Sequence, residues 1–479
     1  MNVLFVTSEA EPFIKTGGLA HVSYALPKYL KRLGVDVRVV IPKYKNIKVP
    51  KEGLKFVKWF TVPVGWRTQY CGIFEYNLDG VIYYFIDNEY YFYRDECYGY
   101  YDEAERFAFF DRASLMMLKE VGFKADIIHC NDWETGMIPV LYKIQYQFDP
   151  FYANIKTIFT IHNLAYQGNF DPNILPDLFN LSKDLYFNGT LGFYSAMSFM
   201  KGGISFSDEI TTVSKTYAEE IQTSGFGERM EGLLKSRKDH IRGILNGIDY
   251  EIYNPSTDKY LFKNYDVNTV RERKNENKVN LQKHLSLYID GQVPMIGIIS
   301  RLTWQKGVGL IKAAIHDILK MDVQFVILGT GDSEAEWFFM NLQRMYPGRV
   351  SANMLFDEVL EHRIYGASDI FLMPSLFEPC GLSQLIAMRY GSLPLVHETG
   401  GLKDTVKPFN KYTGEGTGFS FASYDPITLV NVLRMALEYY WNDKEVWYNI
   451  VVQAMSCDYS WEKSAKQYKE LYESTIKNG

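Results

Sequence analysis

The 479-residue sequence has few cysteines, no long apolar run and no strong excess of one charge sign. Its five cysteines are odd in number and widely scattered, and none forms a Cys-x-x-Cys pair. This pattern argues against a disulfide-rich secreted fold and gives no zinc signature, and it fits a reducing cytosol. No segment approaches the roughly 20 apolar residues that a membrane-spanning helix needs.

The N-terminus also lacks the basic start and long apolar stretch of a signal peptide. Its short apolar run reads better as a first buried strand, from Val3 to Thr7, and we expect a cytoplasmic protein. The net charge of −6 disfavours nucleic acid or an acidic membrane as a partner. An anionic substrate would therefore need a local cluster of basic residues.

The order of apolar segments predicts an α/β fold with two doubly wound parallel sheets. The first series contains a strand at 3–6, a helix with apolar residues at helical spacing over 19–33, and further strands at 35–42, 81–86, 127–129 and 157–162. Turn residues follow one another at 244–255, and the charged segment 259–283 is expected on the surface as loop and helix.

A second series begins with a strand at 295–300. It continues with a helix at 308–321, strands at 323–328 and 370–373, a helix at 382–390 and a strand at 393–396. We therefore expect an N-terminal Rossmann-like domain over residues 1–243 and a second one over 244–460. Residues 461–479 are expected to form a terminal helix with no strand after it.

Three loops that follow predicted strands carry candidate binding residues, because ligands of such sheets lie beyond the carboxyl ends of the strands. In the first loop, Gly17 and Gly18 allow close approach of a ligand, the helix start offers free N–H groups to an anion, and Lys15 adds positive charge. In the second, Arg301 and Lys306 could both reach a diphosphate. A tight turn and solvated basic residues are the alternative interpretation.

The third loop places Glu378 between a strand and the start of a helix. The amides of Gly381, Leu382 and Ser383 would form a second anion site there. Glu378 would repel a phosphate, but it could bind sugar hydroxyls and balance positive charge at an anomeric carbon. Stabilisation of the helix dipole is the alternative.

Seven motifs in one order resemble bacterial glycogen synthases and plant starch synthases. They are KTGGLA (15–20), HCNDWETG (129–136), TIHNLAYQG (160–168), ILNGID (244–249), SRLTWQKG (300–307), FEPCGLSQL (377–385) and TGGLKDTV (399–406). The tyrosine-rich segment 87–110 looks like the acceptor-side loop of this family. Cys380 in the EPCGL motif, and Ile386 where related transferases with other donors carry a second Glu, favour this branch.

The resemblance implies the GT-B architecture: two Rossmann-like domains that face each other across a deep cleft, with the C-terminal helix crossing back to the first. It implies a retaining transfer of glucose from ADP-glucose to the non-reducing end of an α-1,4-glucan, in glycogen or starch biosynthesis. Donor-binding residues would be Lys15, Gly17, Gly18, Asn246, Arg301, Lys306, Phe356, Cys380, Gly381, Leu382 and Ser383.

The resemblance also implies an acceptor side and a set of residues at the reacting centre. Acceptor residues would be Asp132, Trp133 and Asn163, with Glu9 a weaker candidate. The reacting centre would involve Glu378, His162, Asp132, Lys306 and Arg301. His129 ends an apolar strand and is interpreted as a structural, hydrogen-bonded residue. The segment His129-Cys130-Asn131 departs from the family's usual pattern before Asp132.

No metal or other cofactor is expected. The sequence has no Asp-x-Asp pair and no clustered His and Cys ligands, so basic side chains and helix N-termini would neutralise the leaving diphosphate. A covalent route would need Asp132 or Glu378 beneath the anomeric carbon. We favour front-face departure, with the nucleotide phosphate accepting the acceptor's proton.

Other readings predict different residues. Glycogen phosphorylase would need a pyridoxal phosphate lysine motif, and no segment matches one. A glucan-binding protein that has lost activity would show damage at Lys15, Arg301, Lys306 or Glu378, and all four residues are intact. A related transferase with another acceptor is the third alternative. The sequence gives no oligomeric state.

Overall fold

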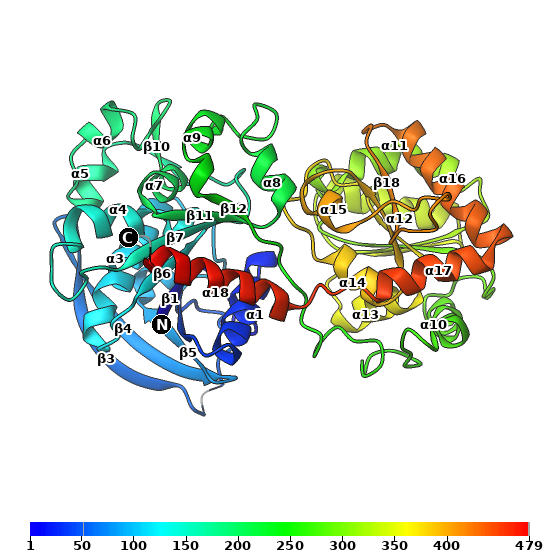
Figure 1. Cartoon of the computed structure of the whole chain (residues 1–479), viewed down its shortest axis with the longest axis horizontal. Coiled ribbons are helices and arrows are strands. Elements are labelled where there is room, and N and C mark those ends of the chain that lie inside the picture. The colour runs from blue at the N-terminus through cyan, green and yellow to red at the C-terminus, as the bar shows by residue number, and fades with distance from the viewer. Residues whose placement is uncertain (51, 478–479) are drawn as a thin grey trace. The chain divides into compact units, whose positions relative to one another are not determined.

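The computed structural model describes residues 1–50 and 52–477. The chain divides into two compact units: unit 1 comprises Met1–Asn246 and Trp461–Gly479, and unit 2 comprises Gly247–Ser460. Each unit has its own mainly or wholly parallel sheet and its own core. Figure 1 shows the two sheets with their covering helices.

Unit 1 contains a nine-stranded sheet and a small three-stranded sheet. The strands of the small sheet, β8 to β10, fall between β7 and β11 of the large sheet in the sequence. Its elements are β1 (Asn2–Val6), α1 (Gly18–Arg32), β2 (Asp36–Pro42), β3 (Lys55–Val64), β4 (Arg67–Leu78), β5 (Val81–Asp87), α2 (Glu89–Phe92), α3 (Glu103–Glu120), β6 (Ile127–Asn131), η1 (Trp133–Thr135), α4 (Met137–Leu141), η2 (Tyr142–Tyr146), β7 (Lys156–Ile161), β8 (Asn169–Phe170), α5 (Ile174–Phe179), α6 (Asp184–Phe187), β9 (Gly192–Phe193), β10 (Ala196–Ser198), α7 (Phe199–Phe206), β11 (Glu209–Thr212), α8 (Lys215–Glu220), α9 (Glu231–Ser236), η3 (Lys238–His240), β12 (Ile241–Gly243) and α18 (Trp461–Lys477).

The large sheet of unit 1 has the strand order β12-β11-β7-β6-β1-β2-β5-β4-β3. All neighbours are parallel except β3 with β4 and β4 with β5, which form antiparallel pairs. The predicted central strands are therefore present. The short strands β8 to β12 carry too few apolar residues to give a periodic signal, and they were not predicted.

The terminal helix α18 packs on unit 1 beside α1 (Figure 1). Its residues Trp461, Tyr468 and Tyr472 are fully buried in the core that β1 and β2 share with α1. Each such ring contributes about 2 kcal/mol by burial. The Tyr472 hydroxyl also lies 2.7 Å from Nδ1 of His129 on β6. The helix therefore completes the core of unit 1, although 214 residues of unit 2 precede it in the chain.

Unit 2 is a six-stranded sheet covered on both faces. Its elements are α10 (Val270–His284), β13 (Met295–Ile299), η4 (Trp304–Lys306), α11 (Val308–Ile318), β14 (Gln324–Leu328), α12 (Ser333–Met345), β15 (Val350–Asn353), α13 (Glu358–Ala367), β16 (Ile370–Met373), α14 (Ser383–Arg389), β17 (Leu393–His397), α15 (Gly400–Thr405), β18 (Phe419–Phe421), α16 (Pro426–Asn442) and α17 (Lys444–Met455). Helices α11 and α16 lie on one face, and α10, α13, α14 and α17 on the other (Figure 1).

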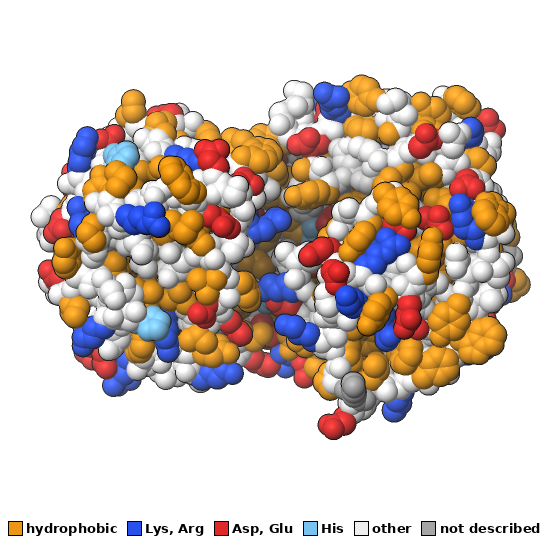
Figure 2. Space-filling view, turned by 180° about the vertical axis from the view of Figure 1, so that it is seen from behind, with side chains coloured by type: hydrophobic (Ala, Val, Ile, Leu, Met, Phe, Trp, Pro, Cys, Tyr) orange, Lys and Arg blue, Asp and Glu red, His pale blue; other side chains and the backbone are white. Residues whose placement is uncertain are grey.

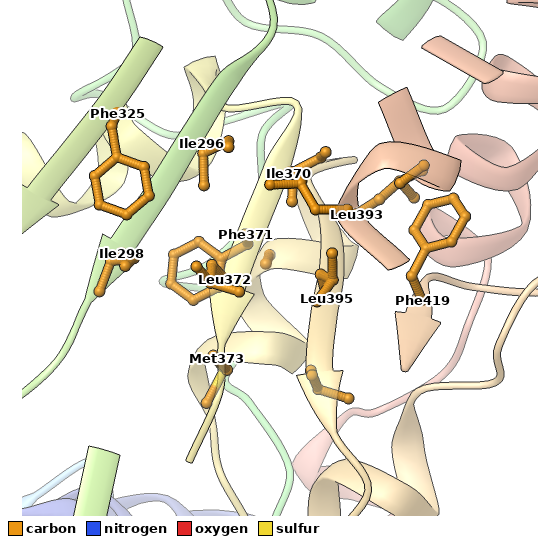
Figure 3. Close-up of a cluster of buried hydrophobic side chains, with 14 of the residues drawn as sticks. Ile296, Ile298, Phe325, Ile370, Phe371, Leu372, Met373, Leu393, Leu395 and Phe419 are labelled. Atoms are coloured by element: carbon orange, nitrogen blue, oxygen red, sulfur yellow. The ribbon is translucent and has the colours of Figure 1, made fainter. Parts of the chain in front are cut away.

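The strands of unit 2 are all parallel in the order β15-β14-β13-β16-β17-β18. Figure 3 shows why they read as continuous apolar runs: side chains such as Ile296, Phe371 and Leu395 fill the core around them. Strands covered by helices on both faces need apolar residues on both. The doubly wound α/β class predicted for both halves is confirmed.

One local expectation was wrong. The segment 259–283 was expected on the surface as loop and helix, and α10 does form there, but Lys274 and Lys278 of this helix are buried. The Lys274 ammonium donates to the carbonyls of Tyr365, Gly366 and Tyr390. Lys278 pairs with Asp369 at 2.8 Å. These partners lie far along the chain, so composition alone marked the lysines as exposed.

Acidic and basic side chains are interspersed over the face shown in Figure 2, as the small net charge suggests. Within residues 1–50 and 52–477, no helix is long and apolar enough to cross a membrane.

Candidate active site

Two loops of unit 2 meet at the carboxyl edge of its sheet, because β13 and β16 are parallel neighbours. The loop after β13 carries Lys306, and the loop after β16 carries Glu378. The Leu376 amide donates to the Gln305 carbonyl at 2.9 Å. Gly307 has φ +79°, and a Cβ there would lie 2.0 Å from the Pro374 carbonyl oxygen. Only glycine lets the two loops approach this closely. We call these two loops, residues 300–307 and 374–383, the double loop.

The double loop brings Lys306 and Glu378 into an ion pair. Lys306 Nζ lies 2.6 Å from Glu378 Oε2. The Ser375 hydroxyl donates to the same oxygen at 3.1 Å. Glu378 is only 6% exposed, so its charge needs these partners. A fixed cation and a fixed anion thus lie side by side at the end of a parallel sheet, where such folds bind ligands.

Arg301 lies in the double loop itself, and Phe356 follows another strand of the same sheet. Arg301 follows β13 and is exposed, and in the described part of the chain its guanidinium has no carboxylate within ion-pair distance. Phe356 follows β15, with β14 lying between β15 and β13. The phenyl ring of Phe356 is 74% exposed. The structure therefore places a cation and an exposed aromatic ring at separate points along this edge.

The start of α14 forms the other side of the double loop. Gly381 has φ +70°, and the first N–H groups of α14, which follows Leu382, have no acceptor within the helix. Cys380 is buried, and its carbonyl accepts from the Gln384 side chain at 3.0 Å. These N–H groups can therefore bind an anion.

The motif TGGLKDTV (399–406) packs against the backbone of the loop after β16. Gly401 donates its amide to the Glu378 carbonyl at 3.1 Å. A Cβ on Gly400 would lie 2.0 Å from the Glu378 carbonyl oxygen, and one on Gly401 would lie 2.1 Å from that of Cys380. Because neither glycine has a side chain, this segment can pack directly against the backbone of residues 378–380.

In unit 1 the loop between β1 and α1 is held by acidic side chains. Glu9 is buried, and its carboxylate accepts from the Thr16 amide. Burial raises the pKa of Glu9. Lys15 Nζ lies 2.6 Å from Glu11 Oε1 and stays partly exposed. Gly17 precedes α1 in an extended conformation. Glu9 thus shapes the loop that carries Lys15, Gly17 and Gly18.

Asp132 lies directly after β6, with φ +57°. Its Oδ1 accepts from the amide of His162 at 2.7 Å and, more weakly, from that of Asn163 at 3.4 Å. Burial raises the pKa of Asp132 to about 7, while these two amides lower it. The structure thus brings Asp132, His162 and Asn163 together, at the carboxyl ends of β6 and β7.

His162 and His129 are both neutral, because burial lowers the pKa of each to about 3. His162 Nε2 lies 2.9 Å from the Asn131 side-chain oxygen. His129 is buried between the Tyr472 and Thr160 hydroxyls, at 2.7 and 2.6 Å. His129 therefore has the structural surroundings expected of it, whereas His162 lies beside Asp132.

Trp133 is packed rather than presented as a free ring. Its indole is 9% exposed and contacts Phe107, Phe170 and Phe199. A Cβ at Gly168, where φ is +58°, would lie 2.3 Å from this indole. Trp133 therefore anchors the turn that follows Asp132.

Asn246, the last residue before unit 2, is 6% exposed. Its side-chain oxygen is buried and accepts no hydrogen bond from any described residue. An unpaired buried acceptor is costly, and a ligand hydroxyl would satisfy it.

Sequence reasoning missed three residues of these sites. Ser375 and Gln305 hold the double loop, and both lie inside or next to motifs in which neither residue was given a role. Glu134 follows Trp133 and is buried, with one unpaired oxygen. Burial, and then the neighbouring Asp132, raise its pKa well above the usual range. The position of Glu134, two residues after Asp132, was the feature of the sequence that could have identified it.

Asp132→Asn is expected to stabilise unit 1 at high pH. The pKa of Asp132 is about 7 in the folded protein, above the ordinary value of 3.8. The free energy of unfolding therefore falls as the pH rises from about 4 to about 7, while the carboxyl group ionises, and stays at the lower value above that. Asparagine stays neutral, so we expect a gain of about 2 kcal/mol near pH 8 and almost none near pH 4. Thermal unfolding at about pH 4.5 and pH 8 measures this, and an equal shift at both values would contradict it.

Among residues 1–50 and 52–477, no group of three or more His, Cys, Asp or Glu side chains is placed to hold a metal ion.

Two family models match the chain. Residues 2–236 match the starch synthase catalytic domain, and residues 282–449 match the glycosyl transferases group 1. A glycogen synthase of Clostridium perfringens (strain 13 / Type A) is 58% identical over 478 residues, which cover 100% of this chain and 99% of that protein. A glycogen synthase of Caldicellulosiruptor bescii is 53% identical, covering 99% of this chain and 100% of that protein.

Solved structures agree. The catalytic domain of Starch Synthase IV from Arabidopsis thaliana bound to ADP and acarbose is 35% identical, with a TM-score of 0.93 and 99% coverage of both chains. Sucrose-phosphate synthase from Thermosynechococcus elongatus, at 16% identity, TM-score 0.64 and full coverage of both chains, shares the fold. Two Rossmann-like units and these matches define a glycosyltransferase of the GT-B type. Within that class, the chain belongs to the family of glycogen synthases and starch synthases.

Proposed function

We propose that the protein is a glycogen synthase, which transfers glucose from ADP-glucose to the non-reducing end of an α-1,4-glucan with retention of configuration. The observation that carries this proposal is the Lys306–Glu378 ion pair, fixed in the double loop of unit 2. Full-length relatives at 51–58% identity carry the name glycogen synthase, which supports the same activity.

Unit 2 would bind the donor. Arg301, Lys306 and the amides of Gly381, Leu382 and Ser383 would contact the diphosphate, since all follow strands at one edge of the sheet. Phe356 would stack on the adenine, and the side chain of Asn246 and the loop with Lys15, Gly17 and Gly18 would contribute from unit 1. The related starch synthase structure contains bound ADP, which supports this assignment.

Unit 1 would bind the acceptor. Asp132 and Asn163 would contact glucan hydroxyls, and Trp133 and Glu9 would hold the loops on which these residues depend. His162 is neutral, so it can contact sugar hydroxyls without adding charge. Unit 1 would therefore supply the acceptor contacts.

Bond breaking at the anomeric carbon would proceed as follows. The diphosphate leaves with the bonding electron pair, and Lys306, Arg301 and the N-terminus of α14 stabilise its charge without a metal. Glu378 offsets the positive charge that develops on the glucosyl unit. The acceptor hydroxyl attacks from the same face and gives its proton to the departing phosphate. The proposal places the protein in the cytoplasm, where its five free cysteines stay reduced.

Nucleotide release tests the proposed donor and acceptor. We expect release from ADP-glucose to exceed release from UDP-glucose, and to require a malto-oligosaccharide. Folded protein that releases nucleotide from neither donor would be a glucan-binding protein instead. Release without chain growth would preserve the donor site and exclude the proposed acceptor.

A further inference from the structure

Trp304 is a large, exposed aromatic side chain on the double loop, which also carries the ion pair. It begins the short helix η4, two residues before Lys306. The indole is 65% exposed. Its apolar surface contributes little to folding while it stays in water, so a bound ligand would gain from covering it.

The indole of Trp304 is supported from within the double loop. Its ring lies 5.6 Å from the ring of Phe377, at an interplanar angle of 55°. Phe377 directly precedes Glu378, and its carbonyl accepts from the Gln305 side chain. The hydrogen bond from the Leu376 amide to the Gln305 carbonyl joins the two loops at the same place. Trp304 is therefore placed by the contacts that place Lys306 and Glu378.

The strand order indicates which part of the substrates Trp304 can reach. Trp304 and Phe377 follow β13 and β16, the two strands that carry Lys306 and Glu378. Phe356, the proposed adenine contact, follows β15, two positions from β13 in the sheet. Neighbouring strands lie about 4.8 Å apart, so this offset is about 10 Å. Trp304 therefore lies on the sugar side of the donor site and away from the base side.

We propose that Trp304, backed by Phe377, stacks on a glucose ring of the acceptor glucan. This inference rests on the proposed function and adds an acceptor contact from unit 2. The C–H faces of a pyranose ring are apolar, and an indole presents a flat apolar surface to them. The donor glucosyl unit is assigned to the buried Glu378, whereas a polymer that continues beyond its last residue requires an open surface. Trp304 provides one.

Trp304→Ala tests the proposal with the full-length protein. We expect the KM for maltotetraose to rise about tenfold, the loss of roughly one stacking contact. The Kd for ADP should stay within about twofold. Trp304→Tyr should restore most of the acceptor affinity, because it restores an aromatic face. The matched control is Trp337→Ala, since Trp337 is equally exposed at 65% but lies on α12, outside the double loop.

Three results would overturn the proposal. Weaker ADP binding with an unchanged KM for maltotetraose would make Trp304 a base contact. No change in either quantity would make it an ordinary surface residue. Equal losses in Trp304→Ala and Trp337→Ala would indicate a general effect. Calorimetric binding of maltotetraose to both proteins tests the contact even if the wild type extends no glucan, in which case the proposed function itself fails.

Discussion

Glu378→Gln is expected to lower kcat by about 10²–10³-fold, the size of effect seen when a fixed electrostatic partner of a transition state is removed. Glutamine has nearly the same shape, so Ser375 can still donate to its oxygen, but the negative charge beside Lys306 is lost. ADP affinity should be retained or should rise, because Lys306 is released from its ion pair. Steady-state rates and calorimetric ADP binding measure the two effects separately.

The control for this substitution is Glu334→Gln, which removes an ion pair of the same type on the surface. Glu334 Oε1 lies 2.8 Å from Lys312 Nζ, and Glu334 is 86% exposed. The control should keep full activity. Turnover of Glu378→Gln near the wild-type value, in protein that unfolds normally, would end the assignment of Glu378 to the transition state.

Lys306→Ala is the second substitution with a large expected effect. The ammonium is assigned to the diphosphate, and a charge-assisted contact contributes about 1.5–3 kcal/mol. The change also leaves the buried Glu378 carboxylate without its cation. We therefore expect kcat/KM for ADP-glucose to fall by about 10²–10³-fold, with both a higher KM and a lower kcat.

Lys312→Ala is the matched control, because it removes the lysine of the surface pair. Donor kinetics of this variant should equal those of the wild type. An unchanged dependence of the Lys306→Ala rate on donor concentration would show that Lys306 does not hold the diphosphate.

The sequence allowed the central strands of both sheets, the fold class and most loop positions to be predicted, because buried parallel strands appear as apolar runs. It placed Lys306 and Glu378 after two different strands, 72 residues apart. That these strands are neighbours depends on the order of the sheet, which local patterns do not contain. The ion pair therefore appeared only in the structure.

Burial explains the other differences. The acceptor role of Trp133 stays a prediction, and the structure adds that its ring packs among three phenylalanines. Lys274 was expected on the surface, but the carbonyls of Tyr365 on α13 and Tyr390 after α14 bind its ammonium. In both cases the contacts come from residues far along the chain, so the sequence around Trp133 and Lys274 did not indicate that their side chains are buried.

The central claim is that the protein adds glucose to a glucan through an α-linkage at the non-reducing end. Its most direct test is a proton NMR spectrum of maltotetraose after incubation with ADP-glucose carrying ¹³C in the glucose. We predict longer chains in which the labelled unit is terminal and α-1,4-linked. A β-linked product, or labelled free glucose without chain growth, would contradict the account.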